Sequence, residues 1–223
     1  MGLSHPQVRR YEKEMGVTER FYWLHMKHDV EDWIRRCSNC AGSKGPRTRS
    51  RGEVQKYVVG APFERIAMDV AGPFPETNSR NRYILVIMDY FSKWPEAFAI
   101  PNQEATTVAD CLINHWVSRF GVPLELHSDQ GRNFESQVFQ EVCSVLGIKK
   151  TRNTPLHPQS DGMVERFNRT LLENLRKVVD NHQREGDKHI PLFLLAYRSV
   201  THNRTGQSPA LIIFGKEMRL SMM

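Results

Sequence analysis

Residues 64–100 read ERIAMDVAGPFPETNSRNRYILVIMDYFSKWPEAFAI and contain three strand-like runs. The runs are ERIAMDV (64–70), RYILVIMDY (82–90) and EAFAI (96–100), and all are rich in residues that suit a pleated, buried surface. The sequence takes on this character only beyond Pro62. Three consecutive strands are therefore predicted to open a folded domain.

Helices and strands are predicted to alternate after residue 100. A helical stripe of apolar residues runs through 105–121 and ends at Gly121, and a strand is predicted over 123–129. The remaining predicted elements are a helix over 136–147, a short strand over 148–152 with its basic positions facing solvent, a helix from Asp161 to about residue 182, and a helix over roughly 190–201. The order βββαβαβ favours an α/β fold with a mixed sheet flanked by helices, which is also the order of the ribonuclease H-like fold.

The composition favours a soluble protein with a polyanionic partner. Lys and Arg number 31 against 25 Asp and Glu, which gives a net charge of +6 and a pI near 9.2. No apolar run approaches the ~18 residues that span a bilayer, and no signal-peptide pattern opens the sequence, so an intracellular protein without a membrane partner is expected. Four cysteines are too few for a secreted disulfide scaffold, which favours reduced thiols or metal ligation.

The N-terminal region combines a predicted helix with a cysteine pair. Apolar residues recur at three- and four-residue intervals between Phe21 and Arg36, which predicts one amphipathic helix. Cys37 and Cys40 follow directly as an isolated CxxC. Residues 42–52 are rich in glycine and basic residues and are predicted to form a linker, which is either a solvated tether or a contact to DNA.

Three acidic residues stand where metal-dependent phosphodiester chemistry needs them. Enzymes that cut or join phosphodiesters commonly use two divalent ions ~3.5–4 Å apart, held by a few carboxylates. Asp69 lies in the first predicted strand, Asp129 ends the fourth, and Glu165 lies about a turn into the long helix, predicted to point toward the sheet. Each residue taken alone is more readily explained by a structural role, but together they form a candidate catalytic and metal-binding set.

Six segments carry a resemblance to a known family. They are RFYWLHMKHDVEDWIRRCSNC (20–40), FERIAMDVAGPFP (63–75), YILVIMDYFSKWPEAF (83–98), RFGVPLELHSDQGRNFES (119–136), TPLHPQSDGMVERFNRTL (154–171) and AYRSVTHNRTGQSP (196–209). In this order they resemble the integrases of retroviruses and, more closely, of gypsy-type LTR retrotransposons. The resemblance covers nearly the whole chain.

The resemblance implies a ribonuclease H-like catalytic core in which Asp69, Asp129 and Glu165 match the family's acidic triad, with 35 residues between the last two. It implies that two Mg²⁺ or Mn²⁺ ions are bound there. It also implies that the chain trims the 3′ ends of retroelement DNA and joins them to target DNA by in-line transesterification. No nucleotide cofactor is expected, because the sequence contains no GxxxxGK[ST] loop. A homo-oligomer and a location in the nucleus are implied in the same way.

Residues that flank the acidic positions are candidates for contacts with DNA phosphates, although each is equally well explained as a solvated surface group. The candidates are Asn133, Lys149, Lys150, Gln159, Arg166, Asn168 and Arg169. His127 and His157 lie in the same segments and are expected to have structural roles.

The resemblance divides the chain into three parts. Residues 1–43 correspond to a truncated, H2C2-like zinc-binding helical segment, 44–59 to a basic linker and 60–218 to the catalytic core. Cys37, Cys40 and His5 are the candidate zinc ligands, and one histidine of the family's Cys₂His₂ set is missing. The alternative for this segment is a helix hairpin with two free thiols.

Two other functions remain open from the sequence alone. A host-retained or truncated descendant would bind nucleic acid or protein without catalysis, and the early end of the sequence at residue 223 favours it. A ribonuclease H-like hydrolase acting on RNA in hybrids would share the fold and the metals, but the six segments do not support it.

Overall fold

A computed structural model describes residues 23–36, 60–152, 162–178 and 183–220. The chain divides into two compact units, one made of Met1–Glu53 with Leu195–Met223 and the other of Val54–Leu194. The elements of the larger unit are β1 (Arg65–Ala71), β2 (Tyr83–Asp89), β3 (Pro95–Ile100), α5 (Ala105–Cys111), η1 (Leu112–Val117), α6 (Ser118–Phe120), β4 (Glu125–Ser128), α7 (Gln137–Val145), β5 (Lys149–Arg152), α8 (Gly162–Val178), η2 (Gln183–Glu185) and α9 (Gly186–Ser199), whose last residues belong to the other unit.

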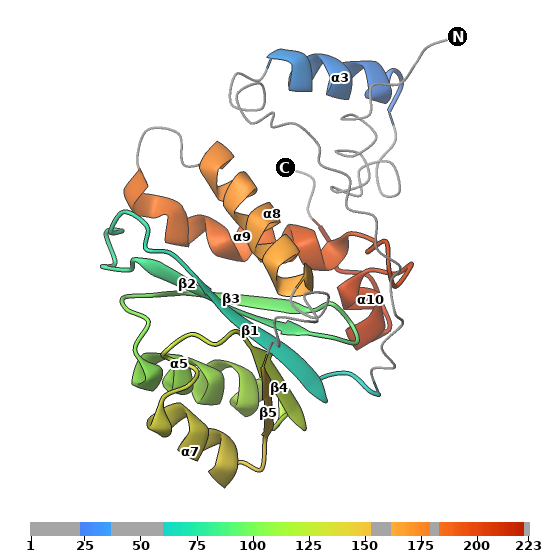
Figure 1. The fold of residues 1–223 in the computed structure, drawn as a ribbon. Helices are drawn as coiled ribbons and strands as arrows, with labels where there is room; N and C mark the ends of the chain where they lie inside the picture. Colours follow the sequence, from blue (N-terminus) through green and yellow to red (C-terminus); the bar gives the residue numbers. More distant parts are fainter. Residues whose placement is uncertain (1–22, 37–59, 153–161, 179–182, 221–223) are drawn as a thin grey trace. The chain divides into compact units, whose positions relative to one another are not determined.

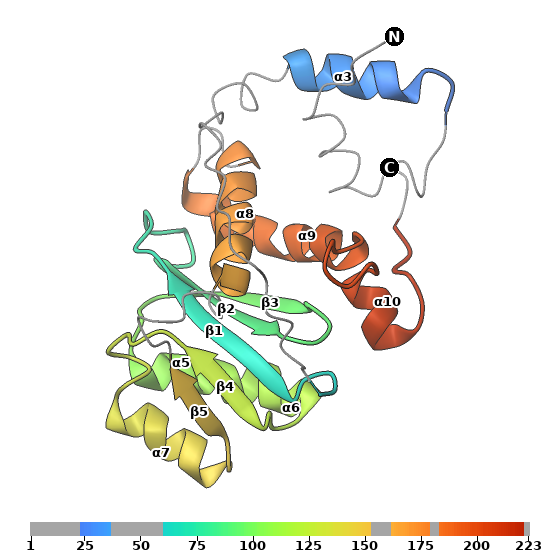
Figure 2. The same ribbon diagram turned by 45° about the vertical axis from the view of Figure 1, so that its right-hand side comes forward.

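The five strands form one mixed sheet in the order β3-β2-β1-β4-β5. β2 pairs antiparallel with both β1 and β3, whereas β4 pairs parallel with both β1 and β5. Figures 1 and 2 show α5 and α7 on one face of the sheet and α8 with the start of α9 on the other. The predicted βββαβαβ order and the mixed sheet flanked by helices are confirmed.

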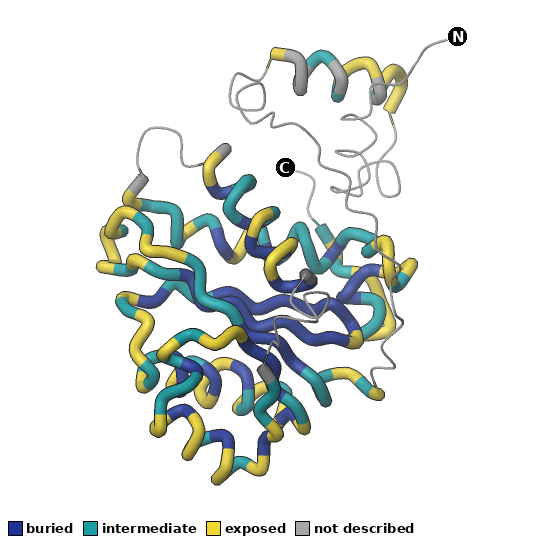
Figure 3. Tube along the Cα trace, in the orientation of Figure 1, coloured by how far each residue is buried: buried dark blue, intermediate teal, exposed yellow. Residues whose placement is uncertain are grey.

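The main core lies between the sheet and the helices α5 to α7. Ile66 and Met68 of β1 point into it, together with Leu126 of β4 and the fully buried Trp116 and Phe139 of the helices. Burying a side chain of this size contributes about 1.5–3 kcal/mol. Figure 3 shows the strands as the most deeply buried part of the chain. Because side chains alternate along a strand, the Asp69 side chain faces α8 instead, where it contacts Asn168.

The helix predicted over 105–121 is present but is not uniform. A π-helical segment, η1, interrupts it between α5 and α6. Leu112 and Trp116 are still fully buried, and the Trp116 ring meets Phe63 edge-on with centroids 5.8 Å apart. Apolar periodicity indicates which residues are buried but not the local widening of the helix, so the sequence did not reveal this segment.

The last helix of the larger unit begins earlier than predicted. The sequence placed it at about 190–201, whereas α9 runs from Gly186 to Ser199 with Pro191 inside it. Proline is typical of the first turn of a helix, whereas Pro191 lies beyond the first turn of α9. The Asp187 carboxylate, in the first turn of α9, accepts hydrogen bonds from Thr77 Oγ1 at 2.9 Å and Asn81 Nδ2 at 3.2 Å. These bonds join the β1–β2 connection to the start of α9.

The smaller unit contributes α3 (Met26–Arg36) and α10 (Pro209–Phe214) to the described residues. The helix predicted over 21–36 is present as α3 but begins only at Met26, and the described residues 23–25 form coil and a turn before it. α10 was not predicted from the sequence. Its cap is clear in the structure, since the Ser208 hydroxyl accepts from the Leu211 amide at 3.0 Å and Gly215 ends the helix with a φ of +66°.

Two of the four cysteines lie in the described residues, Cys111 and Cys143, and both are free thiols. Burial raises the pKa of each thiol above its ordinary value. No helix among residues 23–36, 60–152, 162–178 and 183–220 is both long and apolar enough to cross a membrane.

The Asp187 carboxylate generates a prediction about acid stability. Partial burial raises its pKa, but the hydrogen bonds from Thr77, Asn81, Ser79 and the Lys188 amide outweigh burial and hold the pKa below its ordinary value. A carboxyl whose folded pKa is depressed stabilises the fold above its unfolded pKa of ~3.9, and this contribution is lost as the pH falls through the folded pKa.

We therefore expect Asp187→Asn to lower the thermal midpoint at pH 7 and to differ less from the wild type as the pH falls below the folded pKa. Thermal unfolding followed by circular dichroism from pH 7 to pH 2.5 measures this. An equal difference at both ends of that range would contradict the role of the ionised carboxylate.

Candidate active site

Asp69 lies on the central strand of the sheet, on the face that α8 covers. Its carboxylate is half-buried, and it accepts hydrogen bonds from its neighbour's amide, Val70 N, at 2.9 Å and from Asn168 Nδ2 of α8 at 2.5 Å. β1 lies between β2 and β4, so its backbone is held on both sides. The Asp69 side chain is thus held in place between its own strand, β1, and the helix α8.

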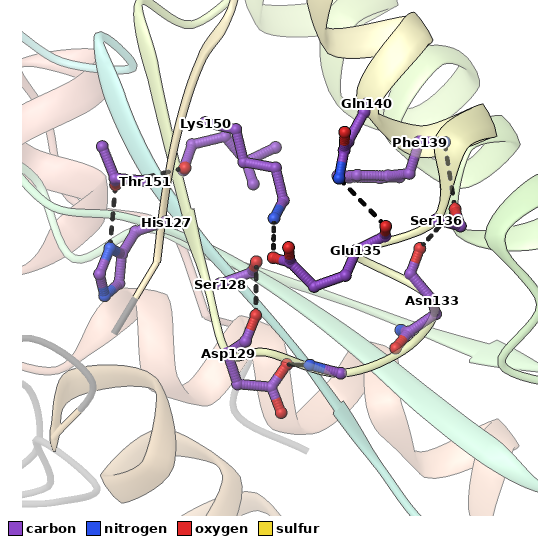
Figure 4. Close-up of polar contacts among 12 residues, drawn as sticks. His127, Ser128, Asp129, Asn133, Glu135, Ser136, Phe139, Gln140, Lys150 and Thr151 are labelled. Atoms are coloured by element: carbon purple, nitrogen blue, oxygen red, sulfur yellow. Dashed lines mark hydrogen bonds and ion pairs between the residues drawn. The ribbon is translucent and has the colours of Figure 1, made fainter. Parts of the chain in front are cut away.

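Asp129 follows the last residue of β4 and lies beside Asp69. The parallel pairing of β1 with β4 ends at the pair Met68–Ser128, and Asp69 and Asp129 are the next residues of the two strands. Paired strands lie about 4.8 Å apart, so the two acidic residues are neighbours at one edge of the sheet. Asp129 is exposed, and its Oδ1 accepts from the Gly131 amide at 3.0 Å (Figure 4).

Glu165 occupies the first turn of α8 and is exposed. That its side chain is directed toward the sheet stays a prediction. Asn168, one turn later on the same side of the helix, is the residue that is 7% exposed and contacts Asp69. The apolar residues Val164 and Phe167 flank both positions and bury the helix against the sheet, which leaves the first turn at the solvent boundary.

Asp89 shows how a structural acid differs from Asp69. Both follow a methionine within an apolar strand. Asp89 is fully buried, and its two oxygens accept from the Phe63 amide at 3.1 Å, from the Ser92 amide at 2.7 Å and from the Ser92 hydroxyl at 2.6 Å. These donors lie in the segment before β1 and in the turn after β2. The Asp89 carboxylate therefore has a structural role.

The paired carboxylates suit a hard cation. Asp69 and Asp129 offer oxygen ligands on neighbouring strands, and Mg²⁺ typically binds one or two protein carboxylates and retains several waters. The Oδ1 atom of Asn168, beside Asp69, is buried and has no hydrogen-bond partner among the described residues. No three His, Cys, Asp or Glu side chains in the described part of the chain lie close enough to enclose a metal ion, so Glu165 does not complete such a group there.

The candidate DNA contacts are distributed differently from the prediction. Lys149 is 73% exposed and pairs with Glu125 at 3.2 Å. Lys150 was predicted to face solvent but its side chain is only 14% exposed, and its Nζ lies 2.5 Å from Glu135 Oε1. The reason is the register, since Lys150 pairs with Leu126 and so lies on the core side of β5.

The other candidates fall into three groups. Arg166 and Arg169 are exposed on α8, and Asn133 is half-buried in the loop after β4. Asn168 is committed to Asp69. Gln159 lies outside the described residues, as do His157 and the candidate zinc ligands His5, Cys37 and Cys40.

His127 has the structural role predicted for it. The ring is 4% exposed, and its Nδ1 lies 2.9 Å from the Thr151 hydroxyl of the neighbouring strand. This contact joins β4 to β5 just before Asp129.

Two residues near Asp129 were missed by sequence reasoning. A Cβ atom on Gly131 would come within 2.6 Å of Asn133 Oδ1 and 3.0 Å of Asp129 Oδ1, so the tight turn favours glycine. Glu135 receives Lys150. The sequence Asp129-x-Gly131 could have indicated the role of Gly131, because Asp side chains commonly accept a hydrogen bond from the amide two residues further on. The role of Glu135 depends on the register of β5, so no local sequence pattern indicates it.

Two family models match the chain, the Integrase core domain over residues 60–158 and the Integrase zinc binding domain over residues 3–46. The Gag-Pol polyprotein of Koala retrovirus is 39% identical over 220 residues, which cover 96% of this chain and 12% of the relative. The Retrovirus-related Pol polyprotein from transposon 412 of Drosophila melanogaster is 26% identical over 207 residues, which cover 92% of this chain and 16% of the relative. The chain thus spans only 12% to 16% of the length of these relatives.

The structure is similar to the crystal structure of the catalytic core domain of BIV integrase. The two are 29% identical with a TM-score of 0.55, and the match covers 69% of this chain and 95% of that one. The resemblance derived from the six sequence segments and the ribonuclease H-like fold are confirmed. The chain belongs to the integrase family of retroviruses and LTR retrotransposons.

Proposed function

We propose that this chain catalyses DNA integration, by trimming the 3′ ends of retroelement DNA and joining them to target DNA. The observation that carries the proposal is the adjacency of Asp69 and Asp129 across β1 and β4 within an Integrase core domain. The net charge of +6 supports a DNA partner.

We propose Asp69, Asp129 and Glu165 as the catalytic, metal-binding residues, with Mg²⁺ or Mn²⁺ as the ions. Bound ions would supply activation of the attacking oxygen and stabilisation of the leaving oxygen. Asn168 would orient the Asp69 carboxylate, and the Gly131 amide would orient that of Asp129. Glu165 would join them by a rotation of its exposed side chain about the first turn of α8.

The reaction balances without a nucleotide cofactor. In strand transfer the freed 3′ hydroxyl forms a bond to a target phosphorus and passes its proton to solvent, and the target's own 3′ oxygen leaves and takes up a proton from solvent. One phosphoester bond forms as one breaks, so the chain needs only to position and stabilise the reacting groups.

Contacts to the DNA backbone are proposed for the exposed residues Lys149, Arg166 and Arg169 and for Asn133 in the loop after β4. Gln159, outside the described residues, stays a candidate from the sequence. Self-association, measured by light scattering, and a nuclear location, measured by imaging of a tagged chain, are parts of the same proposal.

The proposal predicts the effect of neutralising the acids. Asp129→Asn and Glu165→Gln are each expected to reduce Mg²⁺- or Mn²⁺-dependent strand transfer by at least about 100-fold, because each removes a charged ligand from the reacting centre. A fluorescent, pre-trimmed DNA end and a target duplex provide the assay.

Glu141→Gln is the matched control, since Glu141 is an exposed acid on α7 bonded to Gln137 and remote from the site. Its activity should equal that of the wild type. Undiminished strand transfer by Asp129→Asn would contradict the proposal. A folded wild-type chain that binds DNA but never transfers strands would favour the non-catalytic alternative.

We also propose that the N-terminal segment binds zinc through Cys37, Cys40 and His5, supported by the zinc-binding family match over residues 3–46. One zinc ion per chain is expected by elemental mass spectrometry, and Cys37→Ser should lose it. Cys111→Ser is the control, because Cys111 is a free thiol in α5. Zinc-free wild-type protein, prepared with zinc in the medium, would refute this assignment.

A further inference from the structure

The loop between β4 and α7, residues 129–136, carries Asp129 and is closed by its own backbone. The amides of Phe134 and Glu135 both donate to the Gly131 carbonyl at 3.0 Å. Phe134 is 1% exposed and meets Phe139 edge-on with ring centroids 5.5 Å apart, which anchors the far side of the loop in the core. The Ser136 hydroxyl then caps α7 by accepting from the Phe139 amide at 3.2 Å.

The end of this loop next to α7 is joined to the neighbouring strand by an ion pair. Lys150 Nζ on β5 lies 2.5 Å from Glu135 Oε1, and the side chains are 14% and 28% exposed (Figure 4). The Gln140 side chain donates to the Glu135 carbonyl at 3.0 Å, so Glu135 is held at both its backbone and its carboxylate. The Arg65–Glu125 pair of this unit is similarly shielded, with side chains 18% and 29% exposed, whereas the Lys188–Glu185 pair, with side chains 61% and 41% exposed, lies in solvent.

The placement of Lys150 is unusual for a lysine. Its strand partner Leu126 is fully buried in the core, and burial of the nearby Cys143 thiol marks the same surroundings. A lysine directed inward from an edge strand loses hydration, and removing the partner of such a charge is costly because the remaining charge has no compensation. The pair therefore constrains the loop more strongly than a solvent-exposed pair would.

We propose that Lys150 and Glu135 are positioning residues that hold the Asp129 loop against β5 and so keep the Asp129 carboxylate beside Asp69. The inference rests on the proposed function for its catalytic consequence. It assigns Lys150 to the metal-binding geometry rather than to DNA. Lys150 acts through Glu135 and the loop, and neither residue touches the reacting atoms.

The variants Lys150→Met, Glu135→Gln and the exchanged pair Lys150→Glu with Glu135→Lys test the proposal in the full chain. Lys188→Met is the control, since it removes a lysine from an exposed pair of similar length. Glu135→Gln keeps the shape of the side chain and is the variant least prone to unfold.

Two readouts are needed. Hydrogen exchange of the amides of residues 131–136, measured without metal, should accelerate by about tenfold in either single variant and return toward the wild type in the exchanged pair. The Mg²⁺ concentration for half-maximal strand transfer should rise by about tenfold in the single variants, with a smaller change at saturating Mg²⁺. Lys188→Met should change neither value.

Unchanged loop exchange and unchanged Mg²⁺ dependence in both single variants would overturn the proposal. So would weaker DNA binding by Lys150→Met at an unchanged Mg²⁺ requirement, because that result assigns the lysine to DNA. If the wild type has no strand-transfer activity but the loop exchange responds as expected, the proposed function fails while the positioning of the loop stands.

Discussion

The parallel pairing of β1 with β4 is the constraint on which the rest of the site depends. It aligns Met68 with Ser128, so the next residue on each strand is an aspartate. A shift of one residue would turn the side chains of a strand to the opposite face, and the buried Ile66 and Leu126 of the same pairing make such a shift costly. The core thus fixes the distance between two acids that have 59 residues between them in the sequence.

The two aspartates are held in place by different kinds of contact. Asp69 is held by the sheet and by Asn168 from α8, which are regular elements with a buried interface. Asp129 is exposed and depends on a loop, on the Gly131 amide and on the Lys150–Glu135 pair. In the proposed function, a rigid acid beside a loop-borne acid would allow an ion and DNA to enter while one ligand remains in place.

Much of the fold could be predicted because most strands and helices have a recognisable local pattern of apolar residues. The runs at 64–70 and 82–90 and the helix with its cap at Ser136 needed no knowledge of distant contacts. Lys150 was wrongly predicted to face solvent, because its burial depends on the register between β4 and β5. Asn168 was predicted as a candidate contact to DNA phosphates, whereas in the structure it contacts Asp69, 99 positions away.

The most direct test of the account is where a divalent ion binds. Mn²⁺ titrated into the isotopically labelled full chain broadens the signals of amides near the bound ion. The account predicts the strongest broadening at Asp69, Val70, Gly131 and the first turn of α8, with competition by Mg²⁺. Broadening centred on another part of the chain, or none at millimolar Mn²⁺, would contradict the claim that the β1–β4 register builds the metal site.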